Sequence, residues 1–88
     1  MIHARKDYEN RIKDTEEKIG PSEPAFFLTA SDELFPLIVR FYAELADHYG
    51  RSYVSSQFHR HATAARLWQN DHRDQVKLPD MPADAGRY

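Results

Sequence analysis

Five histidines are the residues of this chain best suited to bind a metal ion: His3, His48, His59, His61 and His72. A chelating pair on a helix needs a spacing of three or four residues, and no two of these histidines have that spacing. His59 and His61 would point about 200° apart on a helix. We therefore expect no metal site, with His61 in the core and His59 and His72 facing solvent. A remaining hypothesis is that the histidines make association with a partner sensitive to pH.

Paired carboxylates offer a second kind of chemistry. Glu16 and Glu17, with Glu44 and Asp47 one helical turn apart, resemble part of the magnesium-binding pattern of all-α nucleotide pyrophosphohydrolases of the MazG kind. That pattern needs a further glutamate where this chain has Gly20. The sequence also has no catalytic serine motif, phosphate-binding glycine loop or dinucleotide fingerprint. We therefore predict that the protein is not an enzyme, and that it has no catalytic residues and no cofactor.

Three arginines could bind an anion or a nucleic acid: Arg60, Arg66 and Arg73. Arg66 and Arg73 are seven residues apart and would share one face of a helix, as in a recognition helix. The formal net charge of −2 argues against a nucleic-acid partner, because such binding depends on a basic surface. A nucleic-acid or nucleotide-ligand binding protein is thus the alternative function, and the less favoured one.

Chain length and composition limit the classes of protein that remain. The 88 residues suffice for one domain, which we predict over residues 1–76. The absence of cysteine excludes disulfides and thiolate metal ligands. No apolar run reaches the roughly 18–20 residues of a membrane span, and no secretion signal precedes the domain. We therefore expect a cytoplasmic protein with no membrane partner.

Two long helices are expected to form the centre of the fold, over residues 32–49 and 52–73. Gly50 is predicted to end the first helix, and the short connection makes the two helices antiparallel neighbours. Residues 20–50 contain one basic and five acidic residues, whereas residues 51–77 contain five basic and two acidic residues. Opposite charge on the two segments also predicts that they lie side by side. The expected fold is all-α, a small helical bundle around a central antiparallel helix hairpin.

Apolar spacing predicts which side chains of the two helices meet. In the first helix, the inward stripe is Leu34, Leu37, Ile38, Phe41 and Leu45. In the second helix, the inward stripe is Val54, Phe58, His61, Ala62, Ala65 and Trp68. The alanines are expected to leave room for the large side chains of the first helix.

The chain on either side of this hairpin is expected to be less regular. A thin apolar stripe predicts an N-terminal helix over residues 4–18, which docks on the core. Residues 25–29 are predicted to be extended and to insert their aromatic side chains into the helices, because no second strand is evident to pair with them. Two prolines and no periodicity predict an extended or disordered tail over residues 77–88.

A second apolar stripe on the first long helix is the strongest functional signal: Phe35, Val39, Tyr42, Ala46 and Tyr49. A helix that is apolar around most of its circumference needs cover on several sides, and a short chain supplies little of it. The stripe either completes a monomeric core or forms an interface. We expect a homo-oligomer, a dimer in the simplest case, with a host protein as a second candidate partner. The expected interface anchors are Phe35, Val39, Tyr42, Tyr49 and Tyr53.

One further pattern covers residues 8 to 82. It runs Glu23-Pro24-x-Phe26-x-Leu28-x-x-x-Asp32, then two helices of which the second ends near Trp68, then Lys77-x-Pro79-Asp80-Met81-Pro82. This pattern resembles small uncharacterised helical proteins encoded by bacteriophages and prophages. Many of them have an arginine where this chain has Thr29. The resemblance implies a compact phage accessory protein, a class that often acts by binding a host factor.

Overall fold

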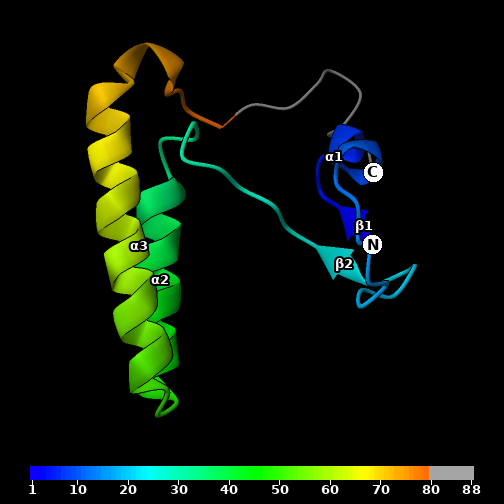
Figure 1. Cartoon of the computed structure of the whole chain (residues 1–88), viewed down its shortest axis with the longest axis horizontal. Coiled ribbons are helices and arrows are strands. Elements are labelled where there is room, and N and C mark those ends of the chain that lie inside the picture. The colour runs from blue at the N-terminus through cyan, green and yellow to red at the C-terminus, as the bar shows by residue number, and fades with distance from the viewer. Residues whose placement is uncertain (80–88) are drawn as a thin grey trace. The chain divides into compact units, whose positions relative to one another are not determined.

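Helices α2 (Phe35–His48) and α3 (Ser52–Asp71) pack side by side along their length (Figure 1). They lie in the second of two units, residues 1–27 and residues 28–79, which together make up the described part of this computed structural model. The prediction of two long packed helices is confirmed, although each helix is shorter than predicted. Residues 80–88 of the predicted tail lie outside the described residues.

Gly50 shapes the turn between the two helices. Its φ of 79° lies in the left-handed region, which glycine adopts without steric cost. The Gly50 N–H donates to the Asp47 carbonyl at 2.9 Å, and the Arg51 N–H donates to the Ala46 carbonyl at 2.8 Å. These two bonds satisfy carbonyls that the end of α2 would otherwise leave without partners. The predicted end of the helix at Gly50 is therefore confirmed, and the chain turns back there to begin α3.

The contact between α2 and α3 is made mainly by small side chains, and this overturns the predicted leucine stripe. The buried residues of the two helices are Pro36, Ala43, Ser55, Ala62, Ala65 and Gln69. Alanine and serine allow the two backbones to approach closely, which leaves no room between them for larger side chains. Leu34, Leu37, Ile38, Phe41 and Leu45 are exposed in consequence.

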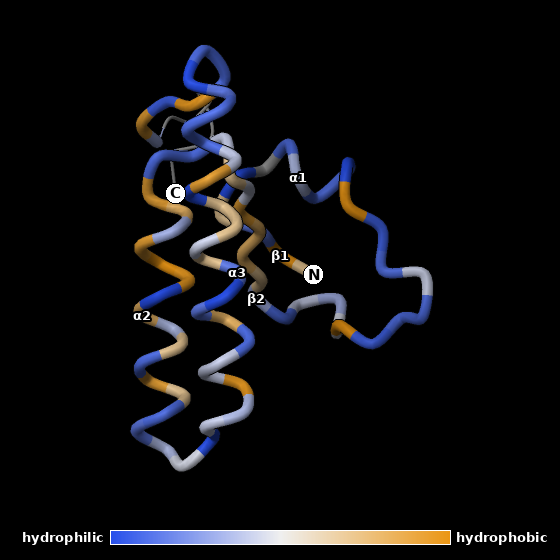
Figure 2. Tube along the Cα trace, turned by 60° about the vertical axis from the view of Figure 1, so that its left-hand side comes forward, coloured by the Kyte–Doolittle hydropathy of each residue, from blue (hydrophilic) through white to orange (hydrophobic). Residues whose placement is uncertain are grey.

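Only part of the predicted inward stripe on α3 is confirmed. Ala62 and Ala65 are buried, and Val54 and Phe58 are half-buried. His61 was predicted to be a core residue and is exposed, and Trp68 is also exposed. Figure 2 shows hydrophobic positions recurring along the whole of α2, whereas α3 is more polar. We call the line of contact between α2 and α3 the seam. On each helix, the side that forms the seam differs from the side on which the largest apolar residues lie.

The open end of the pair is closed by hydrogen bonds to the segment before α2. The Gln69 side chain is fully buried, and its amide donates to the carbonyls of Ala30 at 3.0 Å and Asp32 at 2.9 Å. After the short 3₁₀ helix η1 (Arg73–Gln75), the Lys77 N–H donates to the Ser31 carbonyl at 3.0 Å. The start of α2 is thereby attached to both α3 and the chain beyond it.

The first unit is built differently from its prediction. Strands β1 (Ile2–His3) and β2 (Pro24–Ala25) pair in parallel, so the chain is not entirely α-helical and the extended segment does have a strand partner. The expected helix over residues 4–18 is only α1 (Lys6–Arg11). Beyond it, the Asp14 carboxylate accepts a hydrogen bond from the Ile19 N–H at 2.6 Å. This local bond holds a turn in place of further helix.

The imidazole of His3 is the buried centre of this unit. The Arg5 N–H donates to His3 Nδ1 at 2.9 Å, and His3 Nε2 lies 3.2 Å from the Phe27 carbonyl oxygen. The ring meets Tyr8 edge to face at 4.9 Å and stacks on Phe26 at 5.8 Å. The prediction that Phe26 and Phe27 insert into the helices is therefore wrong, because their rings contact His3 and Tyr8 and remain exposed.

An ion pair next to this centre is sensitive to acid. Arg5 Nη2 lies 3.0 Å from Asp7 Oδ2, and this hydrogen bond lowers the pKa of the Asp7 carboxyl below its ordinary value. A depressed pKa in the folded state means that the pair stabilises this unit while Asp7 is ionised. The stabilisation is lost as the pH falls through the lowered pKa.

The substitution His3→Ala is expected to loosen the first unit selectively. It removes two hydrogen bonds and two ring contacts, at a cost of about 2 kcal/mol. Trypsin should then cut within residues 5–13 more than about tenfold faster, because cleavage follows the population of the opened state. His59→Ala, at an exposed position of α3, is the matched control. Equal cleavage rates in the two variants would show that His3 does not hold this unit together.

Candidate interaction surface

Ten large apolar side chains of the α2–α3 pair are exposed to solvent, with exposed fractions from 36% to 77%. Seven lie in or beside α2 and three lie on α3: Leu34, Leu37, Ile38, Phe41, Tyr42, Leu45, Tyr49, Tyr53, Leu67 and Trp68. Exposed apolar residues are ordinary when they are scattered, but here they recur along one helix. The positions of these side chains on the helices decide whether they form a continuous surface.

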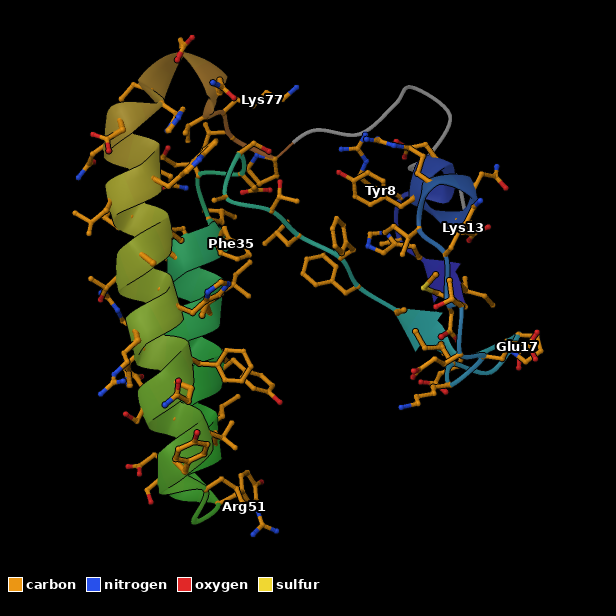
Figure 3. All side chains as sticks on the ribbon, viewed as in Figure 1. Tyr8, Lys13, Glu17, Phe35, Arg51 and Lys77 are labelled. Carbon is orange, nitrogen blue, oxygen red and sulfur yellow. The ribbon has the colours of Figure 1, made fainter. Side chains whose placement is uncertain are left out.

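A spacing of alternately three and four residues places one apolar row on each helix. On α2 the row is Phe35, Ile38, Tyr42, Leu45 and Tyr49, and on α3 it is Val54, Phe58, His61, Ala65 and Trp68. We call these ten residues together the apolar face. Figure 3 shows the side chains along the pair, with Phe35 at one end of α2 and Arg51 beyond the other.

Ring contacts show that the two rows lie on the same side of the pair. The Tyr42 ring meets the Phe58 ring at 4.8 Å, and the Phe35 ring meets the imidazole of His61 at 5.8 Å. Both contacts are edge to face, the geometry that aromatic quadrupoles favour. The apolar face is therefore continuous from α2 to α3, and it is not divided by the seam between them.

The opposite side of the pair is mostly polar, although the exposed Leu37 of α2 and Leu67 of α3 also lie on it. Helical geometry places Arg40, Glu44 and Asp47 of α2 there, and Ser56, His59, Thr63 and Asn70 of α3. At one end of this side, Glu33 lies 3.3 Å from Arg73 and 3.9 Å from Arg66. The pair thus has one solvated side and one apolar side, each formed by both helices.

The five predicted anchors all lie on this pair, but they differ in exposure. Tyr42, Tyr49 and Tyr53 are exposed, whereas Phe35 and Val39 are half-buried. Val39 is on the turn that faces α3, next to the small residues of the seam. Sequence reasoning missed Ile38 and Leu45 because it assigned them to the contact with α3. Ile38 and Leu45 lie three or four residues from Phe35, Tyr42 and Tyr49. This spacing alone could have placed them on the same side of α2.

The three candidate anion-binding arginines are not brought together as a binding site. Arg66 and Arg73 both approach the Glu33 carboxylate, and each also donates to a neighbouring side chain. Within residues 1–79, Arg60 makes no ion pair and is exposed. A carboxylate between two arginines neutralises the positive charge that a phosphate would need.

The candidate metal-binding and acidic residues are scattered over both units, with His3, Glu16 and Glu17 in the first and the others in the second. Within residues 1–79, no group of three or more histidine or carboxylate side chains lies close enough to hold a metal ion. His59 faces solvent, as predicted. His72 is half-buried, because its ring stacks on Trp68 at 4.2 Å and its Nδ1 lies 2.8 Å from the Trp68 carbonyl oxygen.

Comparisons with other proteins leave this surface as the main guide to function. A comparison with models of protein families, with curated proteins and with solved structures gave no match. Among residues 1–79, no helix combines the length and the apolar character that crossing a bilayer requires.

Proposed function

We propose that this protein is a non-catalytic protein-interaction module that associates with a second copy of itself through the apolar face. The supporting observation is the exposure of five large apolar side chains on this face, namely Ile38, Tyr42, Leu45, Tyr49 and Trp68. Monomeric proteins seldom leave so large a continuous apolar surface in water. In this proposal the pair is an antiparallel hairpin, and two hairpins together complete a small helical bundle.

The exposed part of the apolar face supplies much of the area that a stable dimer buries. A partner in a specific complex buries about 800 Å² of its own surface. Large side chains cover roughly 150–250 Å² each, so the five on the apolar face that are exposed by 36–77% offer about 500 Å², to which the half-buried Phe35, Val54 and Phe58 add. Removing such apolar surface from water favours association, and the affinity depends on how well the aromatic anchors pack as well as on area.

Two other partners remain as alternatives to a second copy. The resemblance to small phage-encoded proteins makes a host protein the second candidate occupant of the same face. A nucleic acid or nucleotide bound by Arg60, Arg66 and Arg73 is less favoured, because Glu33 already pairs with two of these arginines. We propose a cytoplasmic location for the module, in keeping with a phage accessory protein.

Light scattering during size-exclusion chromatography tests the proposal. The wild-type chain of 10.3 kDa is expected to elute with twice its own mass. The double variant Tyr42→Ala/Tyr49→Ala should bind about 100-fold more weakly or worse, because each buried aromatic anchor contributes about 2 kcal/mol. Far-UV circular dichroism should show its helices intact.

Ser56→Ala/His59→Ala, a double variant on the polar side of α3, is the matched control and should remain dimeric. A wild-type chain that stays monomeric at high concentration contradicts self-association. Loss of helix in the tyrosine variant would instead identify Tyr42 and Tyr49 as residues of a monomeric core.

A further inference from the structure

We infer that the neutral form of His3 holds the first unit, residues 1–27, closed, and that this unit opens when the ring takes up a second proton. The inference concerns the unit that the proposed association does not use, so its outcome does not depend on that proposal. His3 is an ionisable side chain with only 2% of its surface exposed. Taking an ionised side chain out of water is costly unless it is paired, so the partners of this ring decide its behaviour.

Both ring nitrogens of His3 lie against backbone groups. The Arg5 N–H donates to Nδ1 at 2.9 Å, so Nδ1 offers a lone pair and the proton of the neutral ring is on Nε2. Nε2 then donates to the Phe27 carbonyl oxygen, 3.2 Å away, and the Phe27 N–H also lies against it. The neutral ring therefore connects the residue that begins α1 to the residues that follow β2.

A second proton on this ring would have no acceptor. It can bind only Nδ1, where the new N–H would face the Arg5 N–H, so a hydrogen bond is replaced by a contact between two donors. The rings of Tyr8 and Phe26 hold the imidazole in this orientation, with centroids at 4.9 Å and 5.8 Å. Protonation therefore requires the ring to leave its place, which frees β1 and α1 from the residues after β2.

The charged groups of α1 give a protonated ring no carboxylate partner. The guanidinium groups of Arg5 and Arg11 lie 4.6 Å and 5.0 Å from the centroid of the Tyr8 ring, and the Asp7 carboxylate pairs with both of them. Glu9 is the other acidic residue of this helix, and its Oε1 atom is buried without a hydrogen-bond partner. A positive charge on the imidazole would thus lie beside two guanidinium groups that share one carboxylate.

The charged groups beside β2 are also engaged elsewhere. The Glu23 carboxylate accepts a hydrogen bond from the Gly20 N–H at 3.2 Å, and the Met1 ammonium donates to the Gly20 carbonyl at 2.7 Å. Within residues 1–79, no carboxylate forms an ion pair with the His3 ring. The closed unit therefore holds the neutral ring and excludes the charged one.

Opening in acid follows from this difference in proton binding. The opened unit exposes the ring to water, where an imidazole ordinarily gains its second proton near pH 6.5. Stability falls with pH wherever the opened state binds more protons than the closed state. The opened population should therefore rise about 30-fold between about pH 8 and about pH 5. The Asp7 ion pair acts at lower pH, because its hydrogen bond to Arg5 lowers the pKa of the Asp7 carboxyl.

Amide hydrogen exchange of the full chain, corrected for the intrinsic exchange rate at each pH, measures the opening. The reporting amides are those of Arg5 and of Ile12, whose N–H donates to the Tyr8 carbonyl at 3.0 Å. Their protection should fall by about 30-fold over this pH range, while that of the seam residues Ala43 and Ala62 changes much less. Constant protection at Arg5 and Ile12, or an equal loss at the two alanines, overturns the inference.

Two variants assign the pH dependence to His3. His3→Asn keeps an acceptor for the Arg5 N–H, because the Oδ1 atom of asparagine takes the place of Nδ1, but it does not titrate. Its protection should be lower than that of the wild-type chain and constant over this pH range. Asp7→Asn is the matched control and should retain the full pH dependence. Persistence of the dependence in His3→Asn, or its loss in Asp7→Asn, overturns the inference.

Nitrogen NMR of the wild-type ring keeps the inference testable if the first unit does not close in His3→Asn. At about pH 8 the His3 ring should carry its proton on Nε2 and leave Nδ1 as an acceptor. A proton on Nδ1 at this pH contradicts the arrangement from which the opening is inferred.

Discussion

The Ile38→Asp substitution is expected to convert the protein into a monomer whose helices remain intact. Ile38 lies on the apolar face between Phe35 and Tyr42, 40% exposed in the single chain, and a second copy would cover it. A carboxylate at this position is solvated in the monomer but desolvated and unpaired in the dimer. Burying such a charge costs about 3–5 kcal/mol, so the dimer should weaken by about 10² to 10³-fold or more.

Sedimentation equilibrium of the Ile38→Asp and wild-type chains over a range of concentrations measures this effect. Ser56→Asp introduces the same charge at an exposed position on the polar side, and it should leave the dimer unchanged. If Ser56→Asp weakened association as much as Ile38→Asp, net charge would be responsible and the apolar face would not be the interface.

The Gln69→Leu substitution is expected to give the largest loss of stability in the α2–α3 pair, about 2–3 kcal/mol. Leucine has a similar volume, so the loss arises from hydrogen bonds. The Ala30 and Asp32 carbonyls each lose the amide donor, and Arg66 Nη1 loses the acceptor that Gln69 Oε1 provides at 3.0 Å. Partly buried polar groups left without partners cost about 1–3 kcal/mol each.

Urea unfolding followed by circular dichroism, at one fixed protein concentration, measures the loss. Gln75→Leu, an exposed position in η1, should change the unfolding free energy by less than about 0.5 kcal/mol. Gln69→Glu should cost more than Gln69→Leu at neutral pH, because it sets a carboxylate against two carbonyl oxygens. Equal stability of Gln69→Leu and Gln75→Leu would show that the Gln69 amide does not hold the start of α2.

The sequence was sufficient to locate the two long helices but not the faces by which they meet. Pro36 and Gly50 mark the beginning and the end of α2 through local backbone rules. Both the leucine stripe and the row that includes Ala43 have helical spacing, so periodicity alone does not say which one meets α3. The two backbones approach closely only where both helices present small residues. Which row of α2 meets α3 therefore depends on the residues of both helices together.

The first unit could not be predicted because its structure depends on contacts distant in sequence. The acid–base pair Asp7–Arg11 exists, at 3.4 Å, yet helix ends at Arg11. The strand pair joins residues 2–3 to residues 24–25, and no local pattern indicates such a partner. His3 likewise looked like a candidate metal ligand in an isolated sequence, and only its packing against Tyr8 and Phe26 reveals a structural role.

The fully buried alanines of the seam connect internal packing to recognition. Ala43 and Ala62 have no exposed surface, and they set how far apart α2 and α3 lie. The apolar face is formed by both helices, so its width follows directly from that separation. A single added methyl group at either alanine would widen the face without altering any residue on it. During evolution, the choice of partner could therefore drift through substitutions that no partner ever touches.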